Sequence, residues 1–456
     1  MAGLSRRGFL ARSGVLAGGL VVGSGAACSS GGDGGGDADE QGDDGDAGRD
    51  DQGSSTSLPF DPGDWASVRD QFPLTPDLRH FAAFVLAAHP APVAAAIERH
   101  RRGLDEDTNG YLAATEADAE SAVRTAAGEY LDAPPGDIAL TDSTTMGLGL
   151  VYGGLRLGPG QEVVTTEHDF YSTHEALRLQ AERTGATVRR VRLYDDPADA
   201  SVDGLVGPLV EAVTPATRAL AVTWVHSGTG VKLPVAAIAE ALRDVNDDRD
   251  EDDRVLLCVD GIHGLGVEDV TVADLGCDFL ISGTHKWLFG PRGTGIVWGR
   301  PEAWAAVAAA IPPFSPDSFT GWVTGTPATG EPPGLRTSPG GYHSFEHRWA
   351  ATEAFAFHQA IGKQAVAERT HDQATRLKEG LADVPGVELV TPMSAELSSG
   401  IVCVAPEAAP EEVLGALQAE GIVASLTPYA HSYVRFGPSI VTTPDEVDAV
   451  VEALRA

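Results

Sequence analysis

The sequence predicts an α/β protein that has a mostly parallel sheet in a large domain and a smaller α+β domain at the C-terminus. Short apolar segments alternate with helical segments up to about residue 340, and this alternation is typical of a parallel sheet covered on both faces. After Gly341 a long helical stretch precedes shorter strands and helices. A length of 456 residues, more than one core usually fills, also favours two domains.

The large domain begins with an N-terminal arm and two helical stretches, at residues 92–106 and 116–133. Seven apolar segments then predict the strands of the sheet, at residues 137–141, 162–167, 187–193, 218–225, 254–260, 277–283 and 295–299. In the second part we expect one helix over 347–384, strands at 386–391 and 399–406, a helix at 411–421, strands at 422–427 and 433–437, and a last helix. The arm and large domain are therefore assigned to residues 59–340 and the small domain to residues 341–456.

Residues 1–28 have the pattern of an export signal. The segment Ser5-Arg6-Arg7-Gly8-Phe9-Leu10 is a twin-arginine motif, and the apolar stretch after it is too short to span a bilayer. That stretch ends in Gly25-Ala26-Ala27-Cys28, which resembles a lipobox. We expect the twin-arginine translocation machinery to export the protein. We also expect acylation of Cys28 to provide its only attachment to a membrane.

Residues 29–58 predict a disordered acidic linker. Between residues 31 and 53 the sequence has nine acids, one base and nine glycines, a composition that cannot form a core. The whole chain has 66 acids against 32 bases, a formal net charge of -34, and most of that charge belongs to the body beyond the linker. A nucleic-acid partner is therefore not expected.

The chain has only four lysines, which limits where lysine chemistry can occur. Lys363 and Lys378 fall on a helix with a polar face, and Lys232 falls in a turn. Lys286, by contrast, is expected to end the apolar strand that begins at residue 277. A lysine that emerges from a buried strand is energetically costly unless it is paired or covalently bonded.

Three other polar features also follow predicted strands, at the edge of the sheet where open α/β folds bind ligands. The segment Ser143-Thr144-Thr145 opens a helix and can cradle a phosphate, although such residues are also ordinary helix caps. His168 can stack on an aromatic ring or be structural, and Asp260 can cap a helix or pair with a protonated ring nitrogen.

Together with Lys286, these features describe a site for pyridoxal 5'-phosphate. The lysine amine forms a Schiff base with the cofactor aldehyde, and the aspartate keeps the pyridine nitrogen protonated so that the ring accepts electrons from the substrate. The spacing of the glycines in residues 147–154 does not give a dinucleotide-binding motif.

From about Leu78 onward the chain resembles the class V aminotransferase superfamily of fold-type I enzymes, and within it the isopenicillin N epimerase-like branch. The resemblance rests on the THKW segment around Lys286 and on the D-x-x-H element that begins at Asp260. It implies cofactor contacts for Ser143, Thr144, Thr145, His168, Asp260, His263, His285 and Lys286, of which Lys286, Asp260 and His168 take part in catalysis. It further implies that Arg435 holds the substrate carboxylate and that the protein is a homodimer.

The sequence also departs from the cysteine desulfurases of this superfamily. The segment 425–435 that ends at Arg435 lacks their nucleophilic cysteine, so desulfurase activity is not expected. Gly283 occupies the position of their phosphate-binding serine, a role that Ser282 or Thr284 can take over, and His226 is a further candidate near the ring. The remaining cysteines of the body lie in apolar runs typical of buried thiols.

The expected function is therefore that of an exported enzyme acting at the α-carbon of an amino acid or an amino-acid-containing small molecule. Epimerisation and transamination are the leading reactions, C-S or β-elimination is the alternative, and a non-catalytic binding module is the competing class. His343-Ser344-Phe345-Glu346-His347 matches an H-x-x-E-H zinc pattern, but it follows a Pro-Gly-Gly turn rather than lying within a helix, so no metal is expected.

Overall fold

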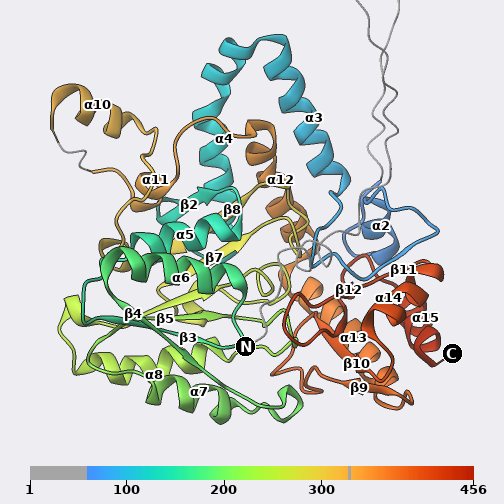
Figure 1. Ribbon diagram of the computed structural model, residues 1–456. Coiled ribbons are helices and arrows are strands. Elements are labelled where there is room, and N and C mark those ends of the chain that lie inside the picture. The colour runs from blue at the N-terminus through green and yellow to red at the C-terminus, as the bar shows by residue number, and fades with distance from the viewer. Residues whose placement is uncertain (1–58, 327–329, 456) are drawn as a thin grey trace, which may run out of the picture. The chain divides into compact units, whose positions relative to one another are not determined.

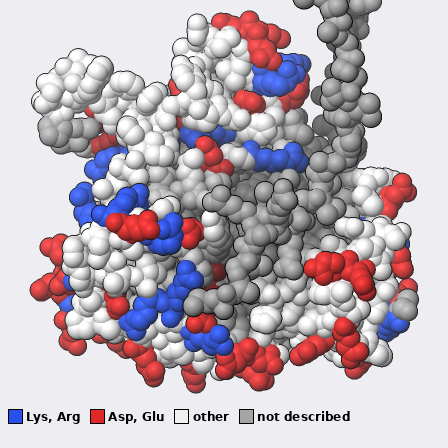
Figure 2. Space-filling view, viewed as in Figure 1, with Lys and Arg blue, Asp and Glu red and all other residues white. Residues whose placement is uncertain are grey.

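The computed structural model of the chain describes residues 59–326 and 330–455 (Figure 1). They belong to the second of two compact units, Thr56–Ala456, and the predicted signal and linker at residues 1–58 lie outside them. Within the described residues, no helix has both the length and the apolar character that crossing a bilayer requires. Figure 2 shows acidic side chains over several parts of the visible face rather than in one patch.

A seven-stranded sheet forms the centre of the large domain, with the strand order β2-β8-β7-β6-β5-β3-β4. Neighbouring strands are parallel except where β8 pairs with β2 and with β7. The strands are β2 (Ile138–Thr141), β3 (Glu162–Thr166), β4 (Thr187–Val191), β5 (Thr217–Thr223), β6 (Leu256–Asp260), β7 (Phe279–Gly283) and β8 (Gly295–Gly299). The predicted mostly parallel α/β sheet is confirmed.

Both faces of the sheet are buried, and this explains the continuous apolar runs in the sequence. Along β6, Leu257 and Val259 pack into one hydrophobic core, whereas Cys258 between them packs into the core on the opposite face. Side chains of α5 (Thr144–Gly154) and α6 (Tyr171–Thr184), which Figure 1 shows next to each other, complete the second core.

The remaining helices of the large domain surround the sheet or extend from it. They are α2 (Trp65–Asp70), α3 (Ala91–Glu106), α4 (Thr108–Leu131), α7 (Val202–Glu211), α8 (Val235–Asp247), α9 (Val272–Leu275), α10 (Pro316–Thr324) and α11 (Pro333–Thr337). In Figure 1, α3 and α4 form a helical hairpin at the top of the view. The helices predicted at 92–106 and 116–133 are present, and the second begins earlier, at Thr108, where Asp107 caps it.

The single helix predicted over 347–384 is wrong, because the chain breaks it into α12 (Phe345–Ile361) and α13 (Lys363–Ala382). Gly362 lies between them with φ 95°, a left-handed conformation that favours glycine and ends a helix. The two helices pack against different elements. Helix α12 packs against α3 and α4, whereas α13 packs against α15 (Pro444–Arg455).

A four-stranded antiparallel sheet with the order β12-β13-β10-β9 forms the small domain. Its strands are β9 (Val387–Leu389), β10 (Val402–Pro406), β12 (Ser425–Leu426) and β13 (Val434–Phe436), with α13, α14 (Pro410–Ala419) and α15 packed around them. The strand predicted at 422–427 is in fact two, because its first half, β11 (Ile422–Val423), pairs with β1 (Arg79–His80) of the N-terminal arm.

Lys378 does not lie on a polar helix face, as the sequence suggested, but is buried with 1% of its surface exposed. Its Nζ donates to the carbonyl oxygens of Pro392 (3.0 Å) and Met393 (2.9 Å) and to Oγ of Ser398 (2.7 Å). Burial lowers the pKa of Lys378 to about 8. This lysine therefore fastens α13 to the loop after β9.

Replacing Lys378 with methionine should lower the free energy of unfolding by about 2 kcal/mol, because buried carbonyl groups would lose their donor while the volume stays similar. Urea unfolding followed by circular dichroism measures this change. Lys363→Met is the control for loss of a lysine that is only partly buried. A Lys378→Met variant as stable as the unsubstituted chain would show that Lys378 does not fasten the loop.

Candidate active site

The predicted site residues meet at the carboxyl edge of the large sheet. Thr144 follows β2 at the start of α5, His168 follows β3, and Asp260 is the last residue of β6. Lys286 does not end β7 but lies in the turn beyond it, because the strand stops at Gly283. Arg435 reaches the same region from β13 of the small domain, and its positive charge acts on both Lys286 and His263.

Burial shifts the pKa values of both Asp260 and Lys286. Asp260 is 2% exposed, and loss of solvation is the main cause that raises its pKa to about 7. Two effects oppose this rise: the Ile262 N–H donates to the Asp260 Oδ1 at 3.1 Å, and the positive charge of Lys286 favours the carboxylate. Burial is the largest cause that lowers the pKa of Lys286; with the opposing effect of Asp260 and the smaller lowering effect of Arg435, the pKa is about 8. Lys286 therefore has an appreciable fraction of free amine near neutral pH.

His263 lies between Lys286 and the indole of Trp287. Its Nε2 is 3.4 Å from the Nζ of Lys286, and its Nδ1 accepts a hydrogen bond of 3.2 Å from the Trp287 Nε1–H. Burial, followed by the nearby positive charge of Lys286, lowers the pKa of His263 well below its usual value. The imidazole is therefore neutral.

The predicted phosphate cradle opens at the N-terminus of α5. Ser143 caps the helix, since its Oγ accepts from the Met146 N–H at 3.1 Å, and the Thr144 Oγ1 accepts from the Gly283 N–H at 2.8 Å. Thr145, next along the helix, is exposed. The amide groups in the first turn of α5 have no acceptor within the helix. Their partial positive charge points outward from the helix end, which suits an anion.

His285 and Gly283 show that a phosphate-bearing cofactor fits this corner. The Nδ1 of His285 is buried without a hydrogen-bond partner. A Cβ at Gly283 would lie 2.8 Å from Cε1 and 2.9 Å from Nδ1 of that imidazole, and 3.1 Å from the Thr144 Oγ1. Glycine at this position thus lets the His285 imidazole and the Thr144 hydroxyl, two groups that can bond to phosphate oxygens, pack close to the backbone.

The hydroxyl groups of both neighbours of Gly283, Ser282 and Thr284, are engaged in contacts within the protein. The Ser282 Oγ donates to the carbonyl oxygen of Gly283 at 2.9 Å, and the Thr284 hydroxyl is bonded to that of Thr294. Both hydroxyl groups are buried in these contacts. The cradle therefore consists of the α5 amides, the Thr144 hydroxyl and the His285 imidazole.

His168 is held by Tyr194, a residue that the sequence did not single out. The two rings stack with centroids 3.8 Å apart and planes 14° apart, and the His168 Nε2 accepts from the Leu193 N–H at 3.2 Å. The Tyr194 hydroxyl bonds to Nδ1 of His226 at 2.9 Å. One face of His168 is thus covered by Tyr194.

Protein contacts hold the Arg435 guanidinium in place but do not use all of its hydrogen-bond donors. Its Nε donates to the Ser425 Oγ and its Nη1 to the Ser227 carbonyl, both at 2.8 Å, while the guanidinium lies 4.9 Å from the ring centroid of Phe84. Within residues 59–326 and 330–455, Nη2 makes no hydrogen bond. Tyr429, which the sequence also did not indicate, bonds through its hydroxyl to the Ser227 Oγ at 2.7 Å.

The three described cysteines, Cys258, Cys277 and Cys403, are buried free thiols, as their apolar surroundings in the sequence predicted. Burial raises the pKa of Cys277 and Cys403 to about 12 and that of Cys258 well above its usual value. None of these thiols is therefore ionised near neutral pH. In the described part of the chain, no three His, Cys, Asp or Glu side chains are grouped as metal ligands.

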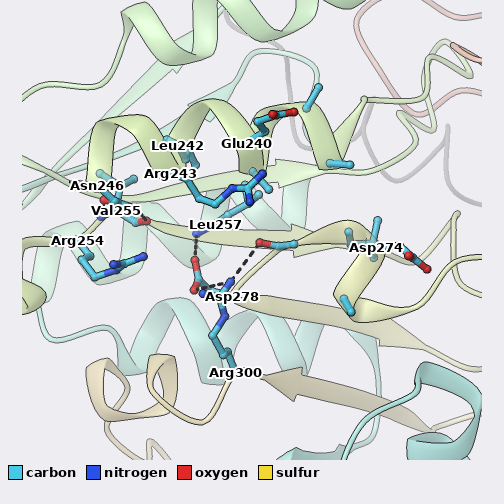
Figure 3. A pocket seen from close by; sticks show the side chains of 16 residues that line it. Glu240, Leu242, Arg243, Asn246, Arg254, Val255, Leu257, Asp274, Asp278 and Arg300 are labelled. Carbon is cyan, nitrogen blue, oxygen red and sulfur yellow. Dashed lines mark hydrogen bonds and ion pairs between the residues drawn. The ribbon is translucent and has the colours of Figure 1, made fainter. Parts of the chain in front are cut away.

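Two large cavities, of about 500 and 730 Å³, lie at the opposite edge of the sheet. Figure 3 shows the smaller one, where Asp278 at the start of β7 accepts from the Leu257 N–H at 2.8 Å and pairs with Arg300 at 3.4 Å. These charged groups are engaged in holding the amino ends of the strands. We therefore place the active site at the carboxyl edge, where the perturbed groups meet.

Comparison with known proteins identifies the family of the chain. Residues 108–450 match the family described as aminotransferase class-V. The chain is 29% identical over 336 residues to an isopenicillin N epimerase of Streptomyces clavuligerus, covering 70% of this chain and 79% of that protein. It is also 29% identical over 319 residues to a probable cysteine desulfurase of Mycolicibacterium paratuberculosis, covering 68% of this chain and 43% of that protein.

Among solved structures, a mutant of C-DES with glycine covalently linked to its PLP cofactor has a TM-score of 0.76, at 19% identity over 85% of this chain and 98% of that one. This likeness confirms the fold. Because the family match spans most of the described residues, the chain belongs to the class V aminotransferase family, whose cofactor is pyridoxal 5'-phosphate.

Proposed function

We propose that the protein is an exported pyridoxal phosphate enzyme that acts at the α-carbon of an amino acid or an amino-acid-containing small molecule, as an epimerase or an aminotransferase. The observation that carries this proposal is the meeting of Lys286, His263, Asp260 and Arg435 at one sheet edge, with Lys286 poised to exchange a proton near neutral pH. Similarity to an isopenicillin N epimerase supports the epimerase form.

Each residue has a separate task in this proposal. When bound, the cofactor supplies an electron sink for the bonds at the substrate α-carbon. Lys286 would hold it covalently and then take and return the α-proton, while Asp260 would face its ring nitrogen and the α5 cradle with His285 its phosphate. Arg435 would bind the substrate carboxylate through the donors that its protein contacts leave over.

C-S or β-elimination on the same scaffold is the second candidate, and similarity to desulfurases supports it. A desulfurase that uses its own cysteine is less well supported, because the described thiols are buried with raised pKa values and the segment 425–435 contains none. A lyase that needs no enzyme thiol is compatible with every contact of the site.

The first prediction concerns covalent binding of the cofactor. The unsubstituted chain purified with pyridoxal phosphate should show a visible absorbance band that borohydride removes, and Lys286→Ala should lack it. Lys363→Ala, which changes a lysine away from the site, should keep the band. A colourless unsubstituted chain that cannot be reconstituted would favour a binding module without catalysis.

The second prediction separates the reactions. Incubation with candidate amino acids in deuterated water should give α-proton exchange with inversion and neither keto acid nor sulfide, as expected for an epimerase. Keto-acid release would favour the aminotransferase, and sulfide release would favour the lyase. No exchange and no product with any amino acid tested would contradict action at the α-carbon.

Export and anchoring rest on residues 1–28 of the sequence alone, and the expected homodimer likewise stays a prediction. If Cys28 is acylated, Cys28→Ala should move the protein from the membrane fraction to the soluble extracytoplasmic fraction, because its lipid anchor is lost. Immunoblotting of the fractions measures this distribution, with Cys403→Ala as the control. Unchanged partitioning would count against lipidation.

A further inference from the structure

Trp287 fixes which nitrogen of His263 carries a proton. An indole Nε1–H only donates, so Nδ1 of His263, 3.2 Å away, has to accept. The proton of a neutral imidazole is then on Nε2. His263 is neutral because burial lowers its pKa well below its usual value, and Lys286, Arg435 and His285 oppose a further positive charge beside them.

The proton on His263 Nε2 in turn selects one form of Lys286. The Nε2–H points to a nitrogen 3.4 Å away, the Nζ of Lys286. An ammonium group has three donors and no acceptor, so it cannot accept this hydrogen bond, whereas the lone pair of a neutral amine can. The contact is therefore satisfied only when Lys286 is deprotonated.

The other charged groups around Lys286 do not reverse this preference. Arg435 also disfavours the ammonium form, and the adjacent His285 is itself shifted toward its neutral form by burial. Asp260 favours the ammonium, but burial raises its own pKa to about 7, so its negative charge is incomplete near neutral pH. The balance leaves the pKa of Lys286 at about 8.

The indole is buried beside two glycines, at which a side chain would crowd it. Trp287 is 2% exposed, and a Cβ at Gly400 or Gly437 would lie 2.5 Å or 3.2 Å from its Cη2. Phe84 stacks on it with centroids 6.2 Å apart and planes 24° apart. Since Gly400 and Gly437 flank strands of the small domain, the small domain keeps the indole N–H directed at His263.

We propose that Trp287 is a positioning residue that acts through His263 to increase the fraction of Lys286 present as the neutral amine, the form that binds the cofactor. The amine nitrogen bonds to the aldehyde carbon, and its two hydrogens leave with the aldehyde oxygen as one water. This proposal rests on the family's cofactor but not on which reaction the enzyme catalyses. The role of Trp287 and the proposed reaction can therefore fail separately.

The test uses Trp287→Phe in the full chain, which removes the donor and keeps an aromatic ring. His263 can then accept from an ammonium, so the pKa of Lys286 should rise by about one pH unit. NMR of isotope-labelled lysine in cofactor-stripped protein measures it, and with four lysines in the chain few signals need assignment. Loading of pyridoxal phosphate should slow about tenfold at pH 7 and be unchanged above pH 10.

Trp304→Phe is the matched control, because its buried Nε1 also donates over 3.2 Å, but to the carbonyl oxygen of Asp137. It should leave both the pKa of Lys286 and the loading rate unchanged. His263→Gln should preserve the pKa, since its amide can accept from Trp287 and donate to Lys286. Equal pKa values of Lys286 in Trp287→Phe and the unsubstituted chain would overturn the proposal.

One measurement needs no substitution and decides the matter even if Trp287→Phe fails to fold. Nitrogen-15 NMR of the imidazoles in the unsubstituted, cofactor-stripped chain should show His263 protonated on Nε2 and not on Nδ1. A proton on Nδ1 would refute the proposal. That result would leave the absorbance test of Lys286 and the reaction assays unaffected.

Discussion

The parallel pairing of β6 with β7 is the constraint on which the site depends. In this register Asp260, the last residue of β6, lies opposite Ile281, and β7 runs two residues further, to Gly283, before the turn that carries Lys286. A slip of one residue would turn Asp260 toward the other face of the sheet. Because both groups are held away from water, their pKa values move toward each other, to about 7 and about 8.

The sequence predicted the fold and the framework of the site. The strands were visible because a sheet buried on both faces requires continuous apolar runs, and Lys286 stood out because so few lysines follow such a run. The ends of the helices and strands within the small domain were harder to predict. Nothing in an apolar and polar pattern indicates that Gly362 takes a left-handed conformation, or that β11 leaves its sheet to pair with β1.

The residues that orient the site could not be predicted, since each acts through a contact between distant segments. Tyr194 covers His168 from the loop after β4, and Tyr429 reaches Ser227 from the small domain. Lys378 looked solvent-exposed because its helix is polar, yet three oxygen atoms brought by the loop after β9 make its burial possible. Trp287 has the sequence signature of any core aromatic residue.

Gly283 and His285 constrain each other's side chains. A serine there, as in the desulfurases, would bring its Cβ within 2.9 Å of the His285 imidazole, which itself belongs to the phosphate corner. The serine would fit only if the His285 imidazole moved, and a change at His285 alone would remove a group that can bond to the phosphate. The effects of substitutions at Gly283 and His285 are therefore not expected to add.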